Sequence, residues 1–417
     1  MSTQEALQLL GAYRVLDLTD EKGFLCGRIL GDLGADVIKI EKSGGDTSRN
    51  IGPFYQNIPD PSKSLYWFVY NASKRGVTLD LETSDGQDIF RRLVKTADFV
   101  IESFSPGYMA SLGLGYSELR KISPRLIMVA ITPFGQTGPY RGYVGSDLVL
   151  SALGGLSHLC GEEDGAPLRI SGVGQAYLQA GAQAAVAALM AHYDRLVSGE
   201  GTYIDISIQE CLCWTTELAI PLWSANKEIF KRRGIYQKRG GPRYRRIFKC
   251  KDGYITYAVQ AGRMTGPMHA RLVKIMDEQG MAGDMKDVDW AKLSMSEISE
   301  EDLARWEALL DKFFAKYTKA EIQQMAVEHQ LIACPVNDIE DISKYVQLEA
   351  RDYWVALDHP ELNAKITYPG FWFKTDKGDC GIRSRAPLVG EHNSEIYEGE
   401  LGFSKEELDV LRQAGVI

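Results

Sequence analysis

Residues 14–41 are RVLDLTDEKGFLCGRILGDLGADVIKIE, and this stretch decides the fold class. Two apolar runs, 14–18 and 36–41, lie on either side of residues 24–34, where apolar side chains recur at helical spacing. A strand, a helix and a second strand joined by short turns predict a βαβ unit with two parallel strands. The chain therefore begins a parallel sheet here.

The same alternation continues beyond this unit. Strands are expected at 76–81, 98–102 and 125–131, with a helix at 84–97. Apolar runs separated by amphipathic helices predict an α/β fold whose parallel sheet is covered on both faces. The three glycines in GRILGDLG have the spacing GxxxGxxG, which differs from the dinucleotide motif G-x-G-x-x-G, so an NAD site is not indicated.

Length and composition limit the class of protein. A chain of 417 residues exceeds one compact core, which predicts two lobes. Its net charge of -9 argues against a nucleic-acid-binding surface. The N-terminal sequence MSTQEALQLL resembles no export signal and no apolar run is long enough to span a membrane, so we expect a cytoplasmic protein. The seven scattered cysteines predict free thiols and no metal site.

The middle of the chain changes character twice. The segment GVGQAYLQAG, residues 172–181, opens a long alanine-rich helix expected at 175–197, with the amide Gln175 at its head. Residues 231–249, KRRGIYQKRGGPRYRRIFK, contain nine Lys or Arg and predict a linker that leaves the first lobe. A strand at 251–259 and helices through 299–330 predict a second, smaller unit beyond it.

Later segments carry start signals for helices. Capping boxes at Thr318 to Glu321 and at Ser404 to Glu407 predict two helix N-termini. Residues 368–376, YPGFWFKTD, predict β structure.

The usual catalytic motifs are missing. The sequence contains no H-E-x-x-H, no G-x-S-x-G and no G-x-x-x-x-G-K-[ST], which removes zincins, common hydrolases and phosphate-loop enzymes. The six histidines are expected to be structural or exposed. Composition and spacing alone lead to a two-lobe α/β protein without an evident nucleophile.

Several segments together resemble the class III CoA-transferase family, which includes formyl-CoA transferase, carnitine CoA-transferase and α-methylacyl-CoA racemase. The matching segments are VLDLT, LGDLGADVIKIEKSGGD, KRGVTLDLETSDGQDIFRRLVKTADFVIESFSPGYMASLGLGY, FGQTGPYRGYVGSDLV, SGEGTYIDISIQE, LEARDYWVALDHP and PLVGEHNSEIYEGELGFSKEELDVLRQAGVI. The resemblance implies a large Rossmann-like lobe built from residues 1–225 and 345–417. It also implies a linker and small α+β lobe at 226–344, and an interlocked dimer.

The resemblance identifies one essential residue that this chain lacks. In the family, an aspartate at the start of the long helix attacks the acyl-CoA thioester, and this chemistry needs a carboxylate. The matching position is Gln175, or Ala176 if the alignment shifts by one residue, and no Asp or Glu occurs between Asp164 and Asp194. Asp164 precedes a glycine and predicts an exposed turn rather than a substitute nucleophile. No catalytic residue is therefore assigned to this chain.

Other matching positions concern CoA itself. In this chain the loop after the first strand carries Asp20, Glu21 and Lys22 where the family has largely neutral groups. Ser146 stands where racemases have a histidine, so racemisation is not expected. Asp147, the next residue, is interpreted as a structural acid in the site. The positions that match CoA-binding residues are Lys42, Lys74, Arg75, Phe104, Pro106 and Gly107.

Together, these features resemble the non-catalytic subunit of a heteromeric transferase, such as the one that moves CoA from succinyl-CoA to (R)-benzylsuccinate. The resemblance implies a homologous catalytic subunit as partner, in a heterodimer or heterotetramer, with acyl-CoA as substrate or ligand and no covalently bound cofactor. Two alternatives stay open: an active homodimeric transferase or isomerase that uses another carboxylate, and a CoA-binding regulatory protein.

Overall fold

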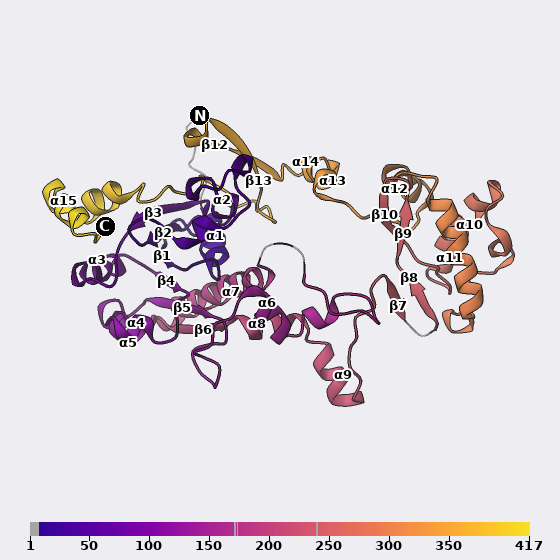
Figure 1. Ribbon diagram of the computed structural model, residues 1–417, viewed down its shortest axis with the longest axis horizontal. Coiled ribbons are helices and arrows are strands. Elements are labelled where there is room, and N and C mark those ends of the chain that lie inside the picture. The colour runs from indigo at the N-terminus through magenta and orange to yellow at the C-terminus, as the bar shows by residue number, and fades with distance from the viewer. Residues whose placement is uncertain (1–7, 171, 173, 239–240) are drawn as a thin grey trace. The chain divides into compact units, whose positions relative to one another are not determined.

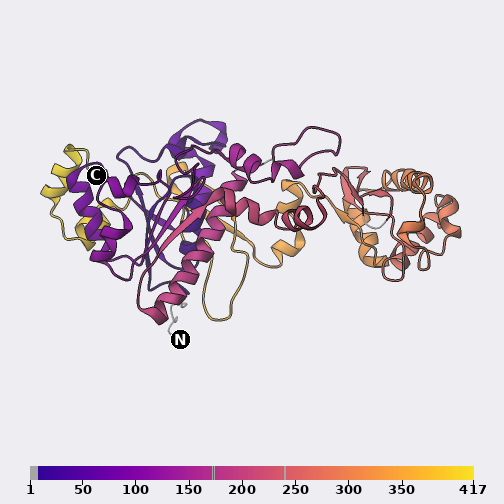
Figure 2. The same ribbon diagram turned by 90° about the horizontal axis from the view of Figure 1, so that it is seen from below.

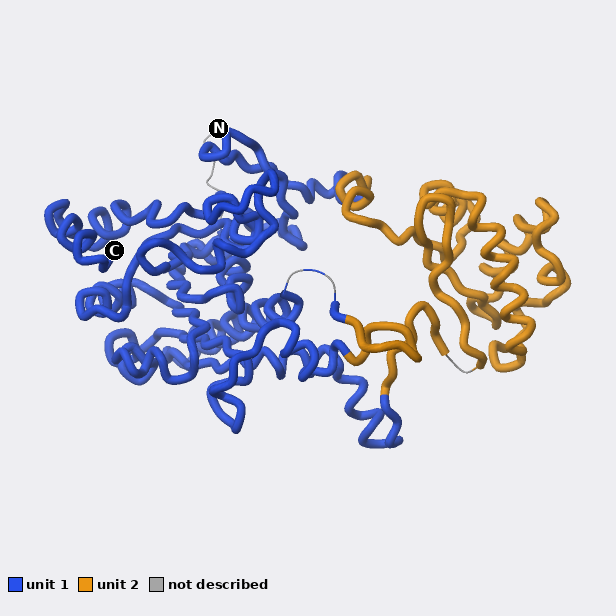
Figure 3. Tube along the Cα trace, viewed as in Figure 1, with its two compact units in different colours: residues 1–157, 169–229, 347–417 blue, residues 158–168, 230–346 orange. Residues whose placement is uncertain are grey.

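The computed structural model describes residues 8–170, 172, 174–238 and 241–417. Its chain forms two compact units (Figure 3). Unit 1 contains residues 1–157, 169–229 and 347–417, so segments from both halves of the chain contribute to it. Unit 2 contains residues 158–168 and 230–346.

Unit 1 is organised around a six-stranded sheet in the order β3-β2-β1-β4-β5-β6, in which all neighbouring strands are parallel (Figure 1). The strands are β1 (Arg14–Leu18), β2 (Asp36–Glu41), β3 (Lys74–Thr78), β4 (Phe99–Glu102), β5 (Ile127–Thr132) and β6 (Tyr203–Ser207). Val15 of β1 lies opposite Val37 on one side and Phe99 on the other. The expected α/β fold with a parallel sheet is confirmed.

Helices cover both faces of this sheet, and Figure 2 shows the longest of them lying along it. One face packs on α3 (Ser84–Val94), α5 (Tyr116–Ile122) and α15 (Lys405–Gln413), and the other on α1 (Phe24–Asp32), α6 (Asp147–Leu153), α7 (Gln175–Ser198) and α8 (Ile208–Thr215). Leu16 and Val100 enter the first core, while Val15 and Ile101 enter the second. Burial on both faces explains why β4 and β5 are nearly continuous apolar runs.

Helix α7 lies directly against α1, and a glycine makes this approach possible. A Cβ atom at Gly181 would stand 2.8 Å from the Cβ atom of Leu25 and 3.2 Å from the backbone nitrogen of Cys26. Ala180 and Ala184 of α7 are fully buried beside it. The alanine-rich helix expected at 175–197 is confirmed, and its small residues set the distance between the two helices.

Shorter elements complete unit 1. They are α2 (Leu65–Asn71), α4 (Tyr108–Ser111), α9 (Ala219–Asn226), the antiparallel pair β12 (Trp354–His359) and β13 (Ala364–Pro369), and a π-helix (Ser394–Glu400). The expectation of β structure through 368–376 is wrong beyond Pro369, where β13 ends. Phe371 packs its ring on Trp372 and Phe373 instead of extending the strand.

Unit 2 has its own core. Its strands are β7 (Tyr236–Lys238), β8 (Arg243–Arg245), β9 (Ile247–Cys250), β10 (Gly253–Thr256) and β11 (Cys334–Pro335), and its helices are α10 (Gly266–Glu278), α11 (Glu300–Phe314), α12 (Lys319–His329) and α13 (Ile339–Ser343). Phe248, Leu272 and Trp306 meet in the core. Both predicted capping boxes are confirmed, at the starts of α12 and α15.

The basic segment 231–249 is more than the linker expected from its composition. It contains β7, β8 and the first part of β9. Tyr244 and Phe248 are buried, whereas Arg245 between them pairs with Asp311 of α11. Alternation of aromatic and basic side chains, rather than charge alone, decides the structure here.

Other short elements connect these parts. They are the 3-10 helices Thr47–Asn50, Tyr55–Asn57, Pro61–Lys63, Ser157–Leu159, Gly283–Asp287, Met295–Glu297 and Pro360–Leu362, and the single turn α14 (Val346–Glu349). None of the helices in the described part of the chain combines the length and apolar character that a membrane span requires.

Gly181 provides a test of the α1–α7 contact. Gly181→Ala should lower the free energy of unfolding by about 1–3 kcal/mol, because the added methyl group overlaps α1. Gly399→Ala is the matched control, since a Cβ atom there meets nothing within 4 Å. Urea denaturation followed by circular dichroism measures both, and equal stability of the two variants would contradict the close contact.

Candidate functional site

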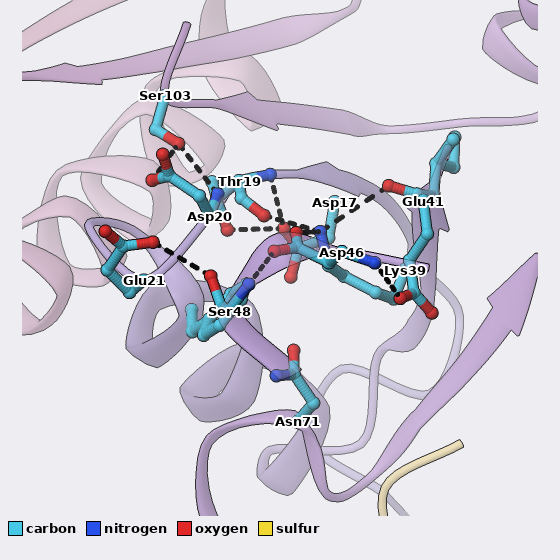
Figure 4. Close-up of polar contacts among 12 residues, drawn as sticks. Asp17, Thr19, Asp20, Glu21, Lys39, Glu41, Asp46, Ser48, Asn71 and Ser103 are labelled. Carbon is cyan, nitrogen blue, oxygen red and sulfur yellow. Dashed lines mark hydrogen bonds and ion pairs between the residues drawn. The ribbon is translucent and has the colours of Figure 1, made fainter. Parts of the chain in front are cut away.

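The candidate site lies where the strand order reverses. Strands β1 and β4 are neighbours, and their following segments lead to opposite sides of the sheet. In parallel α/β proteins, ligands bind beyond the carboxyl ends of the strands at such a point. The loops after β1 and β4 meet here: the Asp20 amide donates to Ser103 Oγ at 2.8 Å, and Ser103 Oγ donates to Asp20 Oδ1 at 2.7 Å (Figure 4).

A cavity of about 330 Å³ opens at this edge of the sheet. Its lining residues are Leu18, Asp20, Ile40, Glu41, Lys42, Gly45, Asp46, Thr47, Leu79, Leu81, Ser103, Phe104 and Tyr108. Two of the predicted CoA-binding residues, Lys42 and Phe104, are among them. Pro106 and Gly107 continue the same loop, and Gly107 has a φ of 86° at the start of α4. Both apolar side chains, such as Leu18 and Phe104, and charged ones, such as Lys42, line the cavity, which suits a ligand with apolar and charged parts.

A larger hollow of about 1290 Å³ lies at the other end of β1. Gly11 and Ala12, which precede β1, form part of its wall, together with Trp372 and Arg383. Trp372 is 61% exposed there. Its position before the amino end of the strand does not match the usual ligand position in a parallel sheet. We therefore place the candidate site at the smaller cavity.

The three basic residues that were predicted to bind the nucleotide lie in different environments. Lys42 is exposed at the cavity. Lys74 is buried, and its Nζ donates to Asp17 Oδ2 at 2.7 Å and to Asn71 Oδ1 at 2.9 Å. Arg75 binds Asp36 through two hydrogen bonds of 2.9 and 2.6 Å and also pairs with acidic side chains of the π-helix. Burial of Lys74 favours a structural role over the predicted nucleotide contact.

A buried polar network supports the loops of the site. Asp17 Oδ1 accepts from the Thr19 amide at 2.9 Å and from Thr19 Oγ1 at 2.6 Å, while Lys39 Nζ donates to the Thr19 carbonyl (Figure 4). Burial opposes the charge on Asp17, but Lys74 and Lys39 hold its pKa below the usual range. Burial lowers the pKa of Lys74 to about 8. The network joins β1, β2 and β3 beneath the β1–α1 loop.

A second ion pair holds the loop after β2. Arg49 donates to both carboxylate oxygens of Glu41 at 2.7 Å, and its guanidinium lies 3.7 Å from the ring centre of Trp67. Ser48 in the same loop donates from Oγ to Glu21 Oε2 at 2.8 Å (Figure 4). The loops after β1 and β2 are therefore tied to each other.

The head of α7 lies close to the loop after β1. Gln175 is the first residue of the helix and is half-buried. Asp147 Oδ1 accepts from the Ala176 amide at 2.8 Å, so a residue from α6 binds the N-terminus of α7. Burial, together with the negative charge of Glu21, raises the pKa of Tyr177 to about 12. The structure thus brings together the β1–α1 loop, Asp147 and Gln175, the residue that the sequence resemblance matches to the nucleophile.

Asp164 belongs to unit 2. It occupies an exposed turn, where the Gly165 amide donates to the Glu162 carbonyl at 3.2 Å. The turn predicted from the Asp-Gly pair is confirmed.

Sequence reasoning missed Glu102, the last residue of β4. Glu102 is 4% exposed and accepts from the Phe104 amide at 2.7 Å. Burial is the main reason that its pKa is raised to about 8, and the negative charges of Asp20 and Asp205 act in the same direction. The sequence signal that could have identified Glu102 is an acidic residue at the end of an apolar strand. The described residues contain no group of three or more metal-binding side chains.

The fold defines a Rossmann-like α/β protein with a cavity at the carboxyl edge of its sheet, the edge at which proteins of this architecture bind ligands. The model of CoA-transferase family III matches residues 10–393, and the chain belongs to this family. Class III CoA-transferases use acyl-CoA as substrate.

Relatives and a solved structure cover nearly the whole chain. Subunit BbsE of succinyl-CoA:(R)-benzylsuccinate CoA-transferase from Thauera aromatica is 34% identical over 410 residues, 97% of each chain. The beta subunit of succinyl-CoA–L-malate CoA-transferase from Chloroflexus aurantiacus is 31% identical over 416 residues, 98% of each chain. The crystal structure of a CaiB/BaiF family protein from Brucella suis matches with a TM-score of 0.82 at 27% identity, covering 95% of this chain and 100% of that chain.

The Asp17–Lys74 pair predicts a large effect on stability. Lys74→Met should lower the free energy of unfolding by about 3 kcal/mol, because it leaves the carboxylate of Asp17 buried without its nearest counter-charge. Adding Asp17→Asn should recover part of the loss. Lys42→Met, at an exposed ion pair, is the control and should change stability by less than about 1 kcal/mol. Urea denaturation of the four proteins tests this, and equal effects at positions 42 and 74 would contradict it.

Glu102 predicts a pH dependence. Its pKa rises from 4.5 to about 8, so its contribution to stability is fully present below pH 4.5 and is lost as pH rises to 8. Glu102→Gln, which stays neutral, should therefore be more stable than the wild type at pH 8 by about 1–3 kcal/mol and similar at low pH. Denaturation curves between these pH values, with the exposed Glu118→Gln as control, measure the difference. Parallel curves for Glu102→Gln and wild type would refute it.

Proposed function

We propose that this chain is the non-catalytic subunit of a class III CoA-transferase that moves CoA from an acyl-CoA to a carboxylic acid. One observation carries the proposal: an amide, Gln175, is the first residue of α7, the position that the sequence resemblance matches to the nucleophile. A nucleophile that forms and then releases an acyl anhydride must be a carboxylate, and an amide cannot perform this step. The catalytic aspartate is then supplied by a homologous partner subunit.

The surroundings of Gln175 support this proposal. The nearby carboxylate of Asp147 accepts a hydrogen bond from the helix amide of Ala176, so it is engaged as a cap. Glu21 accepts from Ser48, and Asp20 is paired with Lys22 and Ser103. Each of these acids has a structural partner in the chain. The two relatives described above are both named as subunits, which also favours a heteromeric assembly.

The proposal includes a binding role for the cavity. Lys42 and Phe104, with Pro106 and Gly107 in the adjoining loop, contact the nucleotide end of CoA, and the acyl-CoA is bound without any covalent cofactor. The size of the cavity, about 330 Å³, suits a nucleotide base better than the whole of CoA. Contacts from Lys74 and Arg75 stay predictions, and their ion pairs do not favour them.

The donor and acceptor follow from the relatives. We propose succinyl-CoA as donor and a dicarboxylic acid as acceptor, with (R)-benzylsuccinate as the specific candidate. The assembly is an interlocked heterodimer or heterotetramer with the catalytic homologue, and it acts in the cytoplasm. The two open alternatives, an active homodimer and a regulatory CoA-binding protein, are outcomes of the following test.

Covalent trapping tests the assignment. The purified chain, its Gln175→Asp variant and the complex from the native source are incubated with succinyl-CoA, quenched with hydroxylamine or borohydride, and measured by mass spectrometry. We expect no adduct on this chain or on the variant, because the loop with Asp20 and Glu21 differs from a catalytic one. The homologous partner should carry the adduct.

Two outcomes would contradict the proposal. An acyl or CoA adduct on any carboxylate of the wild-type chain would favour the active homodimer. A chain that purifies without a homologue and binds CoA without reaction would favour the regulatory protein.

A further inference from the structure

An ion pair lies beside the cavity of the candidate site. Lys42 follows β2 and Tyr108 begins α4, and both line the cavity. Glu82, in the turn before α3, joins them: its Oε1 lies 2.9 Å from Lys42 Nζ and accepts from the Tyr108 hydroxyl at 3.0 Å. The hydrogen bond from Lys42 is the main reason that the pKa of Glu82 is lowered, so its carboxylate is ionised at neutral pH.

The charges of the cavity give this pair its importance. Among the described residues of the lining, Lys42 is the one cation, whereas Asp20, Glu41 and Asp46 are acidic. Each of these acids has a basic partner: Lys22 for Asp20, Arg49 for Glu41 and Lys39 for Asp46. Lys42 is therefore the counter-charge that the cavity offers to a phosphate, but Lys42 is already paired with Glu82.

We infer that Glu82 is a specificity-determining residue that weakens the binding of phosphate-bearing ligands to this cavity. The inference rests on the proposed function, in which the ligand is CoA with its 3′-phosphate and diphosphate. Glu82 neutralises Lys42 and adds a negative charge at the rim, and both effects oppose an anion. The consequence is weaker binding of acyl-CoA to a subunit that has no nucleophile, which leaves more acyl-CoA for the catalytic partner.

Calorimetry with the full chain tests this inference. CoA, 3′-dephospho-CoA and adenosine are titrated into the wild type, Glu82→Gln, Lys42→Met and the double variant. Glu118→Gln is the matched control, because Glu118 forms a similar exposed pair with Lys121 at 2.7 Å, but Lys121, unlike Lys42, does not line the cavity. Glutamine at position 82 still accepts from Tyr108, so only the charge is removed.

Glu82→Gln should strengthen CoA binding by about threefold or more. The gain should be smaller for 3′-dephospho-CoA, absent for adenosine, and lost at high salt. Lys42→Met should remove the gain in the double variant, because Lys42 is the cation that Glu82→Gln releases. Glu118→Gln should behave as wild type.

The outcomes separate this inference from the proposed function. If CoA binds and Glu82→Gln does not strengthen it, or strengthens adenosine binding equally, the inference is wrong and CoA binding stands. If neither wild type nor Glu82→Gln binds CoA, both are wrong.

Discussion

The buried contact between Asp17 and Lys74 is the constraint on which the rest of unit 1 depends. It joins the central strand β1 to β3 across β2, and both side chains lie without solvent exposure. Two opposite charges inside a core need each other, because either one alone would be strongly destabilising. Thr19 binds the same carboxylate, so the loop that follows β1 takes its direction from this pair.

The site is formed by several loops that contact one another rather than by one sequence motif. The β1–α1 loop contacts Ser103 after β4 and Ser48 after β2, and α1 contacts α7 through Gly181. The loops after β1, β2 and β4 therefore share one edge of the sheet. Their side chains are mostly committed to one another, which agrees better with a supporting subunit than with a site that must rearrange around a reacting thioester.

The sequence predicted the periodic helices and strands of this structure. It did not predict the side-chain roles that depend on contacts between residues far apart in the sequence. Periodic residue patterns predicted β1, β2 and α7, and the structure confirms these three elements. Lys74 was matched to a CoA-binding position, and nothing in the sequence shows that Asp17 lies beside it. Glu82 and Glu102 were missed for the same reason: their roles come from Lys42 and from burial, which the fold decides.

The cap on α7 has a consequence for evolution. Asp147, on a different helix, accepts the hydrogen bond of Ala176, so the start of α7 is secured whatever side chain stands at position 175. A duplicated gene could lose its aspartate there by a few nucleotide changes without losing the fold. The architecture thus tolerates drift at the very position that defines the chemistry, and this tolerance offers a short route from two identical subunits to a pair that divides its labour.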